Sequence, residues 1–166
     1  MVRTLAKLRV PLGFLAGAVA LWLARPTPRS LLFGAAIAVP GELVRIWAAG
    51  HLTRWREVTR SGPYRFLSHP LYVGSSIMAI GFAVAAAHPA VAVLVAVYMS
   101  VTLTAAVRFE ARELRQQFGA DYEAWRQGQP AASTRRFSLA QVIANREYRA
   151  ASGLLIGLAL LWWRSQ

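Results

Sequence analysis

Five long apolar runs, separated by polar connections, dominate the chain. The runs cover residues 10–24, 31–50, 70–87, 89–107 and 150–163. Each is close to the roughly 20 residues that an α-helix needs to cross the hydrocarbon core of a bilayer. The pattern predicts an all-α integral membrane protein with about five transmembrane helices. Since the first and last runs are short, we expect their ends to reach the headgroup region.

The Lys and Arg residues between the runs predict the direction of insertion. Three of them precede the first run, four lie in the 51–69 connection and eight lie in the 108–149 connection. The opposite side of a five-span arrangement carries Arg25, Arg29 and Arg164. Because cytoplasmic loops are enriched in Lys and Arg, we expect a cytoplasmic N-terminus and a C-terminus on the other side of a prokaryotic inner membrane. Both polar connections then face the cytoplasm.

Composition supports a single membrane domain over residues 1–166. Hydrophobic residues make up 56% of the chain, the mean hydropathy is +0.38, and cysteine is absent, which excludes disulfides and thiolate nucleophiles. The net charge of +12 lies in loops suited to anionic headgroups, so we expect membrane lipids and no nucleic acid as partners. The three histidines lack metal-site spacing, and no metal is expected. A signal peptide is the alternative for the first run, and the oligomeric state stays open.

Two ionisable residues, Glu42 and Arg45, lie inside the second apolar run. At a spacing of three they share a helix face, where pairing lowers the cost of burying either charge. Charged residues within spans often belong to functional sites, so both are candidate catalytic residues. The alternative is a structural ion pair near the cytoplasmic end of the helix.

The connection before the third run is rich in candidate residues. Gly62-Pro63 predicts a turn that starts a short helix, and Ser68 is expected to cap the third span. His69 and Tyr72, one turn apart, would share a face of that span. A capped helix start suits an anionic ligand group, although an ordinary helix start with interfacial aromatic residues is the alternative.

After the fourth run the chain is predicted to continue as an amphipathic helix. Its apolar stripe, at spacings of three and four, consists of Val107, Ala111, Leu114, Phe118, Tyr122 and Trp125. We expect this helix to lie along the membrane surface, with Gly119 breaking or ending its first part. Glu110 or Glu113 would face a site at the membrane boundary. The alternative for them is solvated pairing with Arg112 and Arg115.

These residues together resemble a known family. The residues that carry the resemblance are Gly62-Pro63-Tyr64, His69-Pro70-Leu71-Tyr72-Val73-Gly74, Glu110, Leu114, Phe118-Gly119 and Tyr122. Over residues 41–125 the chain resembles the isoprenylcysteine carboxyl methyltransferase group, which includes phospholipid methyltransferases. The resemblance implies a small helical membrane core that binds S-adenosylmethionine through residues 56–74 and 108–125. The cofactor-binding residues that it implies are Val58, Thr59, Tyr64, His69, Pro70, Leu71, Tyr72 and Glu110.

The resemblance also implies the reaction, which is methyl transfer at the cytoplasmic face to a lipophilic carboxylate or amine entering from the bilayer. Arg45 and Arg108 are candidate substrate-binding residues because they lie at the cytoplasmic boundary. Glu42, Arg45 and Glu113 are the catalytic candidates. A carboxylate acceptor needs no base, whereas an ammonium must first lose a proton.

Three positions depart from the family pattern. Ser68 stands where members commonly have Arg, Ala111 replaces the second residue of a Glu-Glu pair, and Ala106 replaces an Arg that holds the carboxylate of isoprenylcysteine. These departures weigh against a prenylated-cysteine substrate. They also keep two alternatives open, namely an NADPH-dependent membrane reductase of the sterol-reductase type and a non-catalytic relative.

Overall fold

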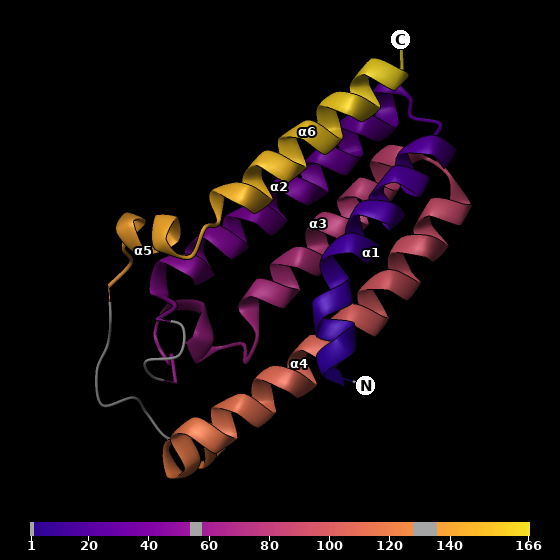
Figure 1. The fold of residues 1–166 in the computed structure, drawn as a ribbon. Coiled ribbons are helices and arrows are strands. Elements are labelled where there is room, and N and C mark those ends of the chain that lie inside the picture. Colours follow the sequence, from indigo (N-terminus) through magenta and orange to yellow (C-terminus); the bar gives the residue numbers. More distant parts are fainter. Residues whose placement is uncertain (1, 54–57, 128–135) are drawn as a thin grey trace.

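The computed structural model describes residues 2–53, 58–127 and 136–166, and within these ranges its regular structure is helical throughout (Figure 1). The helices are α1 (Val2–Leu23), α2 (Pro28–His51), the short 3-10 helix η1 (Gly62–Arg65), α3 (Pro70–Ala86), α4 (Pro89–Arg126), α5 (Leu139–Ala144) and α6 (Tyr148–Arg164). Each apolar run of the sequence coincides with one of the long helices. The all-α prediction is therefore confirmed.

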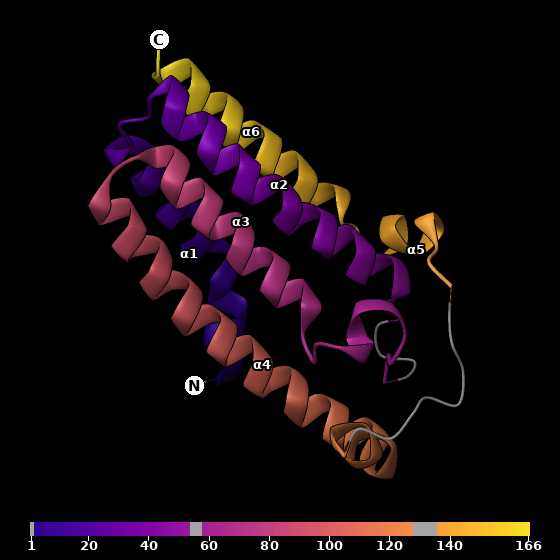
Figure 2. The ribbon, with the colours of Figure 1, turned by 180° about the vertical axis from the view of Figure 1, so that it is seen from behind.

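Two helical stretches are long and apolar enough to cross a bilayer by themselves. They are Pro28–His51, which is α2, and Pro89–Ala124 of α4. The apolar part of α1, Pro11–Leu23, and helix α3 are shorter. Figures 1 and 2 place the two termini at opposite ends of the bundle, the arrangement that an odd number of crossings requires. Five crossings stay a prediction.

Prolines stand in the first turn of four helices. A backbone N–H has no intrahelical partner at that position, so proline loses no hydrogen bond there. They are Pro28, Pro63, Pro70 and Pro89. The predicted short helix after the Gly62 turn is confirmed as η1, and Gly62 has a positive φ of 56°. The prediction that Ser68 caps α3 is wrong. Since Pro70 occupies the first helical position, His69 takes the N-cap place, and its side chain makes no capping hydrogen bond.

Helices α2 and α3 pack at backbone contact through glycines spaced seven residues apart. A Cβ atom on Gly34 would lie 2.5 Å from the carbonyl oxygen of Gly81, and one on Gly41 would lie 2.8 Å from that of Gly74. A Cβ atom on Gly81 or on Gly74 would lie 2.6 Å from the carbonyl oxygen of Gly34 or of Gly41, respectively. Small residues of this kind let membrane helices approach closely. The result is a rigid pair of antiparallel helices at the centre of the bundle (Figure 2).

Helix α4 continues without interruption from its apolar half into its charged half. Its backbone then turns at Gly119, which has φ 42° and ψ −105°, so the predicted break is confirmed. Beyond the break, Tyr122 is buried and the Asp121 carbonyl accepts a hydrogen bond from Arg60 Nη2 at 2.5 Å. The end of α4 therefore contacts the segment that leads into η1.

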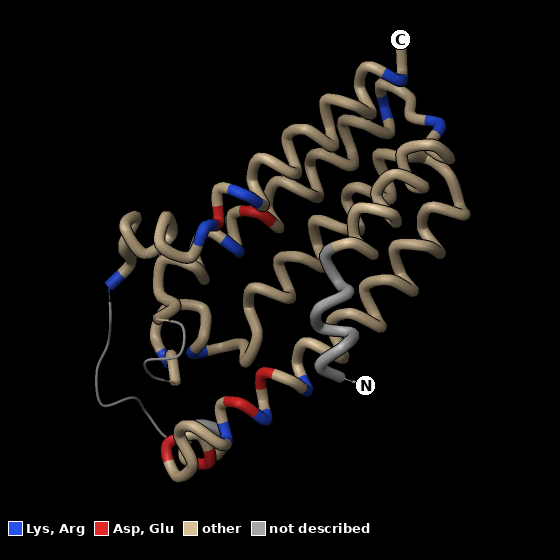
Figure 3. Tube along the Cα trace, viewed as in Figure 1, with Lys and Arg blue, Asp and Glu red and all other residues tan. Residues whose placement is uncertain are grey.

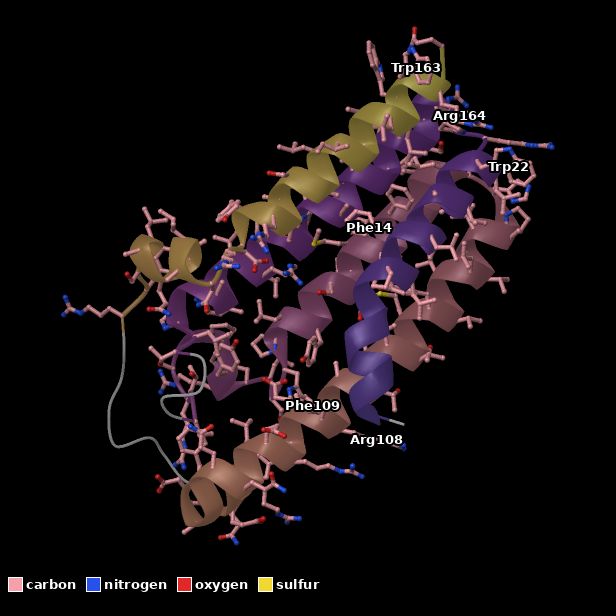
Figure 4. All side chains as sticks on the ribbon, in the orientation of Figure 1. Phe14, Trp22, Arg108, Phe109, Trp163 and Arg164 are labelled. Atoms are coloured by element: carbon pink, nitrogen blue, oxygen red, sulfur yellow. The ribbon has the colours of Figure 1, made fainter. Side chains whose placement is uncertain are left out.

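Large apolar side chains cover the outside of the bundle. Phe14 is 78% exposed and Trp163 is 73% exposed, and Figure 4 shows Trp163 and Trp22 pointing outward. The buried apolar cluster is small. It lies where α1 connects to α2 and α3 connects to α4, at the end of the bundle that holds the C-terminus. A surface of this kind suits lipid rather than water as the solvent.

Charge divides the described part of the molecule into two ends. In Figure 3 the acidic residues, together with most Lys and Arg, lie in the half that contains the charged part of α4, α5 and the start of α6. The other end carries basic residues alone, among them Arg164, whose guanidinium donates to the carbonyls of Trp22 and Ala24 at 2.8 and 2.9 Å. The polar connections of the sequence thus meet at one end of the bundle.

Candidate functional site

A cavity of about 800 Å³ lies in the charged half of the molecule. Its walls come from Arg45 of α2, residues 52–53 and 58–75, the stretch of α4 from 98 to 114, and residues 145–150 at the start of α6. These parts are far apart in sequence. The cavity has the size of an ordinary small-molecule site, and its walls mix apolar and charged side chains.

The cavity brings together nearly all residues predicted for the cofactor. Those that line it are Val58, Thr59, Tyr64, His69, Leu71, Tyr72 and Glu110. Pro70 does not line the cavity but is buried at the start of α3, where it fixes the backbone next to His69. The two segments that the sequence predicts as halves of one site are therefore neighbours in space.

His69 joins the two halves. Its Nδ1 lies 3.3 Å from Glu110 Oε2, across the gap between the start of α3 and α4. Its ring stacks on that of Tyr72, with 5.5 Å between centroids and an interplanar angle of 30°. The predicted common face of His69 and Tyr72 is confirmed. Of the two acidic candidates in α4, Glu110 is the one that faces the cavity.

Thr59 provides an unused polar group in the wall. Its side chain is buried, with 7% of its surface exposed, and its Oγ1 has no hydrogen-bond partner among the described residues. A buried hydroxyl without a partner costs free energy comparable to a lost hydrogen bond. Since Thr59 also lines the cavity, a bound ligand with a polar group would satisfy it.

Arg45 forms the centre of a polar cluster at the inner end of the cavity. Its Nε lies 3.6 Å from Glu42 Oε2, which confirms the predicted pair, and only 2.6 Å from Glu147 Oε1. Its Nη1 donates to Ser75 Oγ and, at 3.4 Å, to the carbonyl of Leu71. One guanidinium thus joins α2, α3 and the start of α6.

The sequence did not indicate Glu147 as a site residue. It lies 102 positions from Arg45, and no periodic pattern links the two. The one available signal is its place as an acidic residue three positions before the last apolar run, in a chain with seven acidic residues. Its neighbours Asn145, Arg146 and Arg149 also line the cavity.

Several other candidates lie outside this cavity. Arg108 and Glu113 do not line it, and Arg108 is exposed on α4 beside the cavity-lining Phe109 (Figure 4). Glu42 is buried behind Arg45, and neither of its carboxylate oxygens has a hydrogen-bond partner within the described ranges. Arg45 is thus the predicted substrate-binding residue that the structure places in the wall.

The three positions that depart from the family pattern lie in cavity walls. Ala106 is 8% exposed and lines the main cavity, so its short side chain leaves space there. Ala111 lines a second hollow of about 580 Å³ on the other side of His69, and Ser68 lines both. Among the described residues, no group of three or more His, Asp or Glu side chains is placed to hold a metal ion.

The structure is that of a helical membrane-type protein with a cavity of small-molecule size at its charged end. The model of the phospholipid methyltransferase family matches residues 12–121, which is more than half of the chain. The chain belongs to the phospholipid methyltransferase family. No curated protein and no solved structure matches it.

Family membership makes methyl transfer in a membrane the class of activity and confirms the resemblance, with a match over residues 12–121 where the sequence predicted 41–125. The matched region contains every residue predicted for the cofactor and ends within α4. Helices α5 and α6, with Glu147, lie beyond it. The cavity therefore has one wall that the family pattern does not describe.

Proposed function

We propose that this protein transfers a methyl group from S-adenosylmethionine to a lipophilic carboxylate or amine at the cytoplasmic face of the membrane. The observation that supports this most is the shared cavity wall of residues 58–72 and 110–114, joined by the 3.3 Å contact of His69 and Glu110. Both segments lie in the region that the family model matches, and they carry the residues on which the resemblance rests. Their convergence on one cavity is what a cofactor site needs.

The donor groups in the wall fit S-adenosylmethionine, which has an aromatic base, ribose hydroxyls and a zwitterionic amino-acid end. The unpartnered Oγ1 of Thr59 offers a hydrogen bond to a polar group. Glu110 offers an acceptor for hydroxyls or an ammonium, while Tyr64 and Tyr72 offer aromatic surface. Bound there, the cofactor supplies an electrophilic methyl group. Val58, His69 and Leu71 complete the set of residues that would hold it.

The chain's own contribution to such a transfer is alignment and exclusion of water. Holding two reactants in the right geometry supplies roughly 7–11 kcal/mol of the barrier reduction. The inner part of the cavity is apolar along α4, where Met99, Leu103 and Ala106 face it, so it suits the chain of a lipophilic acceptor. Arg45 would attract an anionic group of that acceptor. An amine acceptor would pass its proton to a carboxylate, for which Glu110 and Glu147 line the cavity.

The charged end of the bundle supports the cytoplasmic orientation. The cavity lies in the half where most Lys and Arg gather, as Figure 3 shows, and such an excess marks cytoplasmic loops. S-adenosylmethionine is made in the cytoplasm, so a site on this side has access to it. The N-terminus would then lie in the cytoplasm and the C-terminus across the inner membrane of a prokaryote.

Isothermal titration calorimetry of the detergent-solubilised protein tests the proposal. S-adenosylhomocysteine, the product form of the cofactor, is expected to bind, and NADPH is not. Binding of NADPH without S-adenosylhomocysteine would overturn the proposal in favour of a reductase. Binding of S-adenosylhomocysteine without methyl transfer to any lipid extract would indicate a non-catalytic relative.

A further inference from the structure

Residues 137–150, which we call the elbow, lie beyond the family-matched region and are fixed to the end of α2. Ser138 N donates to the carbonyl of Gly50 at 3.1 Å, and Gln141 Nε2 donates to that of Leu52 at 2.8 Å. Asn145 Nδ2 donates both to the Leu52 carbonyl, at 2.8 Å, and to that of Ala49, at 2.9 Å. The last carbonyls of a helix have no intrahelical partner, so these bonds satisfy them. The elbow is thereby placed accurately relative to α2.

A tight turn inside the elbow directs the start of α6. Arg146 adopts a left-handed backbone conformation with φ 58°, which is unfavourable for a residue with a side chain. The turn reverses the chain between α5 and α6 and leaves Glu147 buried at the N-cap of α6. Glu147 makes no capping hydrogen bond there with its side chain. Its carboxylate instead forms an ion pair with Arg45.

The pair of Arg45 and Glu147 is nearly enclosed, with 19% and 6% of the side chains exposed. A buried ion pair is weak evidence for stability, because desolvating two charges offsets most of their attraction. Arg45 already has hydrogen bonds from Nη1 to α3, and within the described part of the chain its Nη2 has no hydrogen-bond partner. Since Arg45 lines the cavity, we infer that Nη2 can serve a ligand there while Glu147 holds Nε and α3 holds Nη1.

The pair shares one cavity with the cofactor segments, which it contacts at the Leu71 carbonyl. Besides the cofactor segments, the cavity is lined by an apolar stretch of α4, with Met99, Leu103 and Ala106, and by the basic residues of the elbow, Arg146 and Arg149. A group that is charged at one end and apolar along its length would be accommodated there. The cavity therefore has lining groups that suit a methyl acceptor as well as the cofactor.

We propose that Glu147 is a positioning residue that orients the Arg45 guanidinium toward the acceptor, so that the elbow takes part in selecting the molecule to be methylated. This inference rests on the proposed function. Glu147 fixes Arg45 Nε by a 2.6 Å contact, while α3 fixes Nη1. With Nε and Nη1 both held, Nη2 is fixed in place at the cavity wall. Without Glu147 the guanidinium keeps its charge and its contacts to α3 but loses the contact that fixes Nε.

Kinetics with variant proteins test the proposal. The probe is methyl transfer from labelled S-adenosylmethionine into a total lipid extract of the host membrane, presented in mixed micelles. We expect Glu147→Gln to raise the apparent KM for the extract by about tenfold and to leave the Kd of S-adenosylhomocysteine within about twofold. The matched control is Glu123→Gln, which removes the carboxylate of an exposed pair with Arg115 (2.5 Å) outside the main cavity and should change neither value.

A double-mutant cycle separates positioning from an independent role. If Glu147 acts through Arg45, the variant with both Arg45→Gln and Glu147→Gln has a KM no higher than Arg45→Gln alone. Additive effects, an unchanged KM in Glu147→Gln, or an equal loss of S-adenosylhomocysteine affinity would each overturn the inference. If Glu147→Gln fails to fold, Glu147→Asp keeps the charge, shortens the reach and should still raise KM. A wild-type protein that labels no lipid would instead overturn the proposed function itself.

Discussion

Replacing Gly34 by alanine tests the backbone contact that holds α2 against α3. An added Cβ would lie 2.5 Å from the Ala85 Cβ, 2.5 Å from the Gly81 carbonyl oxygen and 2.6 Å from the Ala85 nitrogen. Two of these three atoms belong to the backbone of α3 and cannot rotate away. The two helices would have to separate along the seam that Gly34 and Gly81 form.

The magnitude follows from comparison with a second glycine. Overpacking of this kind costs about 1–3 kcal/mol, whereas alanine is favoured over glycine in a helix by about 1 kcal/mol. Gly153 in α6 has no atom within 4 Å of an added Cβ, so Gly153→Ala receives the helical gain alone. The propensity terms cancel in the difference, and Gly34→Ala should be about 1–3 kcal/mol less stable than Gly153→Ala. Denaturant titration in mixed micelles measures this difference, and equal stability of the two variants would refute the packing argument.

Three further predictions concern the cavity and its supports. Tyr72→Ala and Glu110→Ala should each weaken S-adenosylhomocysteine binding by about tenfold or more, which is about 1.4 kcal/mol, whereas calorimetry of Glu123→Ala should give the wild-type affinity. Thr59→Val should leave the free energy of unfolding unchanged or higher, because Oγ1 has no hydrogen-bond partner among the described residues. The same substitution should weaken S-adenosylhomocysteine binding. A loss of stability without a loss of affinity would count against the role of Thr59. Asn145→Ala removes two hydrogen bonds to the end of α2 and should cost about 1–2 kcal/mol, measured by denaturant titration; an unchanged midpoint would contradict the anchoring of the elbow.

The long helices and the break in α4 could be predicted from local patterns. Apolar runs near the length of a bilayer crossing define the helices, and Gly119 interrupts an amphipathic stripe at a place where its positive φ is needed. The cap of α3 was predicted one residue too early, at Ser68, because serine is the better capping residue by type. The position of Pro70 decides instead, and it places His69 at the N-cap.

The cavity could be predicted only as far as the family pattern reaches. His69, Tyr72 and Glu110 follow from motif spacing and topology, because both segments face the same side of the membrane. Glu147 does not, since its contact with Arg45 depends on how α6 returns along α2, which no local period encodes. The position of Arg108 outside the cavity could not be predicted either. It depends on the rotation of α4 about its axis, which decides the side chains that face the cavity.

Transfer of a labelled methyl group from S-adenosylmethionine by the purified protein tests the central claim most directly. The lipid extract of the host membrane serves as the acceptor mixture, and Glu110→Ala serves as the control that lacks the α4 side of the cofactor site. We predict that the wild-type protein places label in one lipophilic species of the extract and that Glu110→Ala places far less. An extract that stays unlabelled, together with no binding of S-adenosylhomocysteine in calorimetry, would contradict the account.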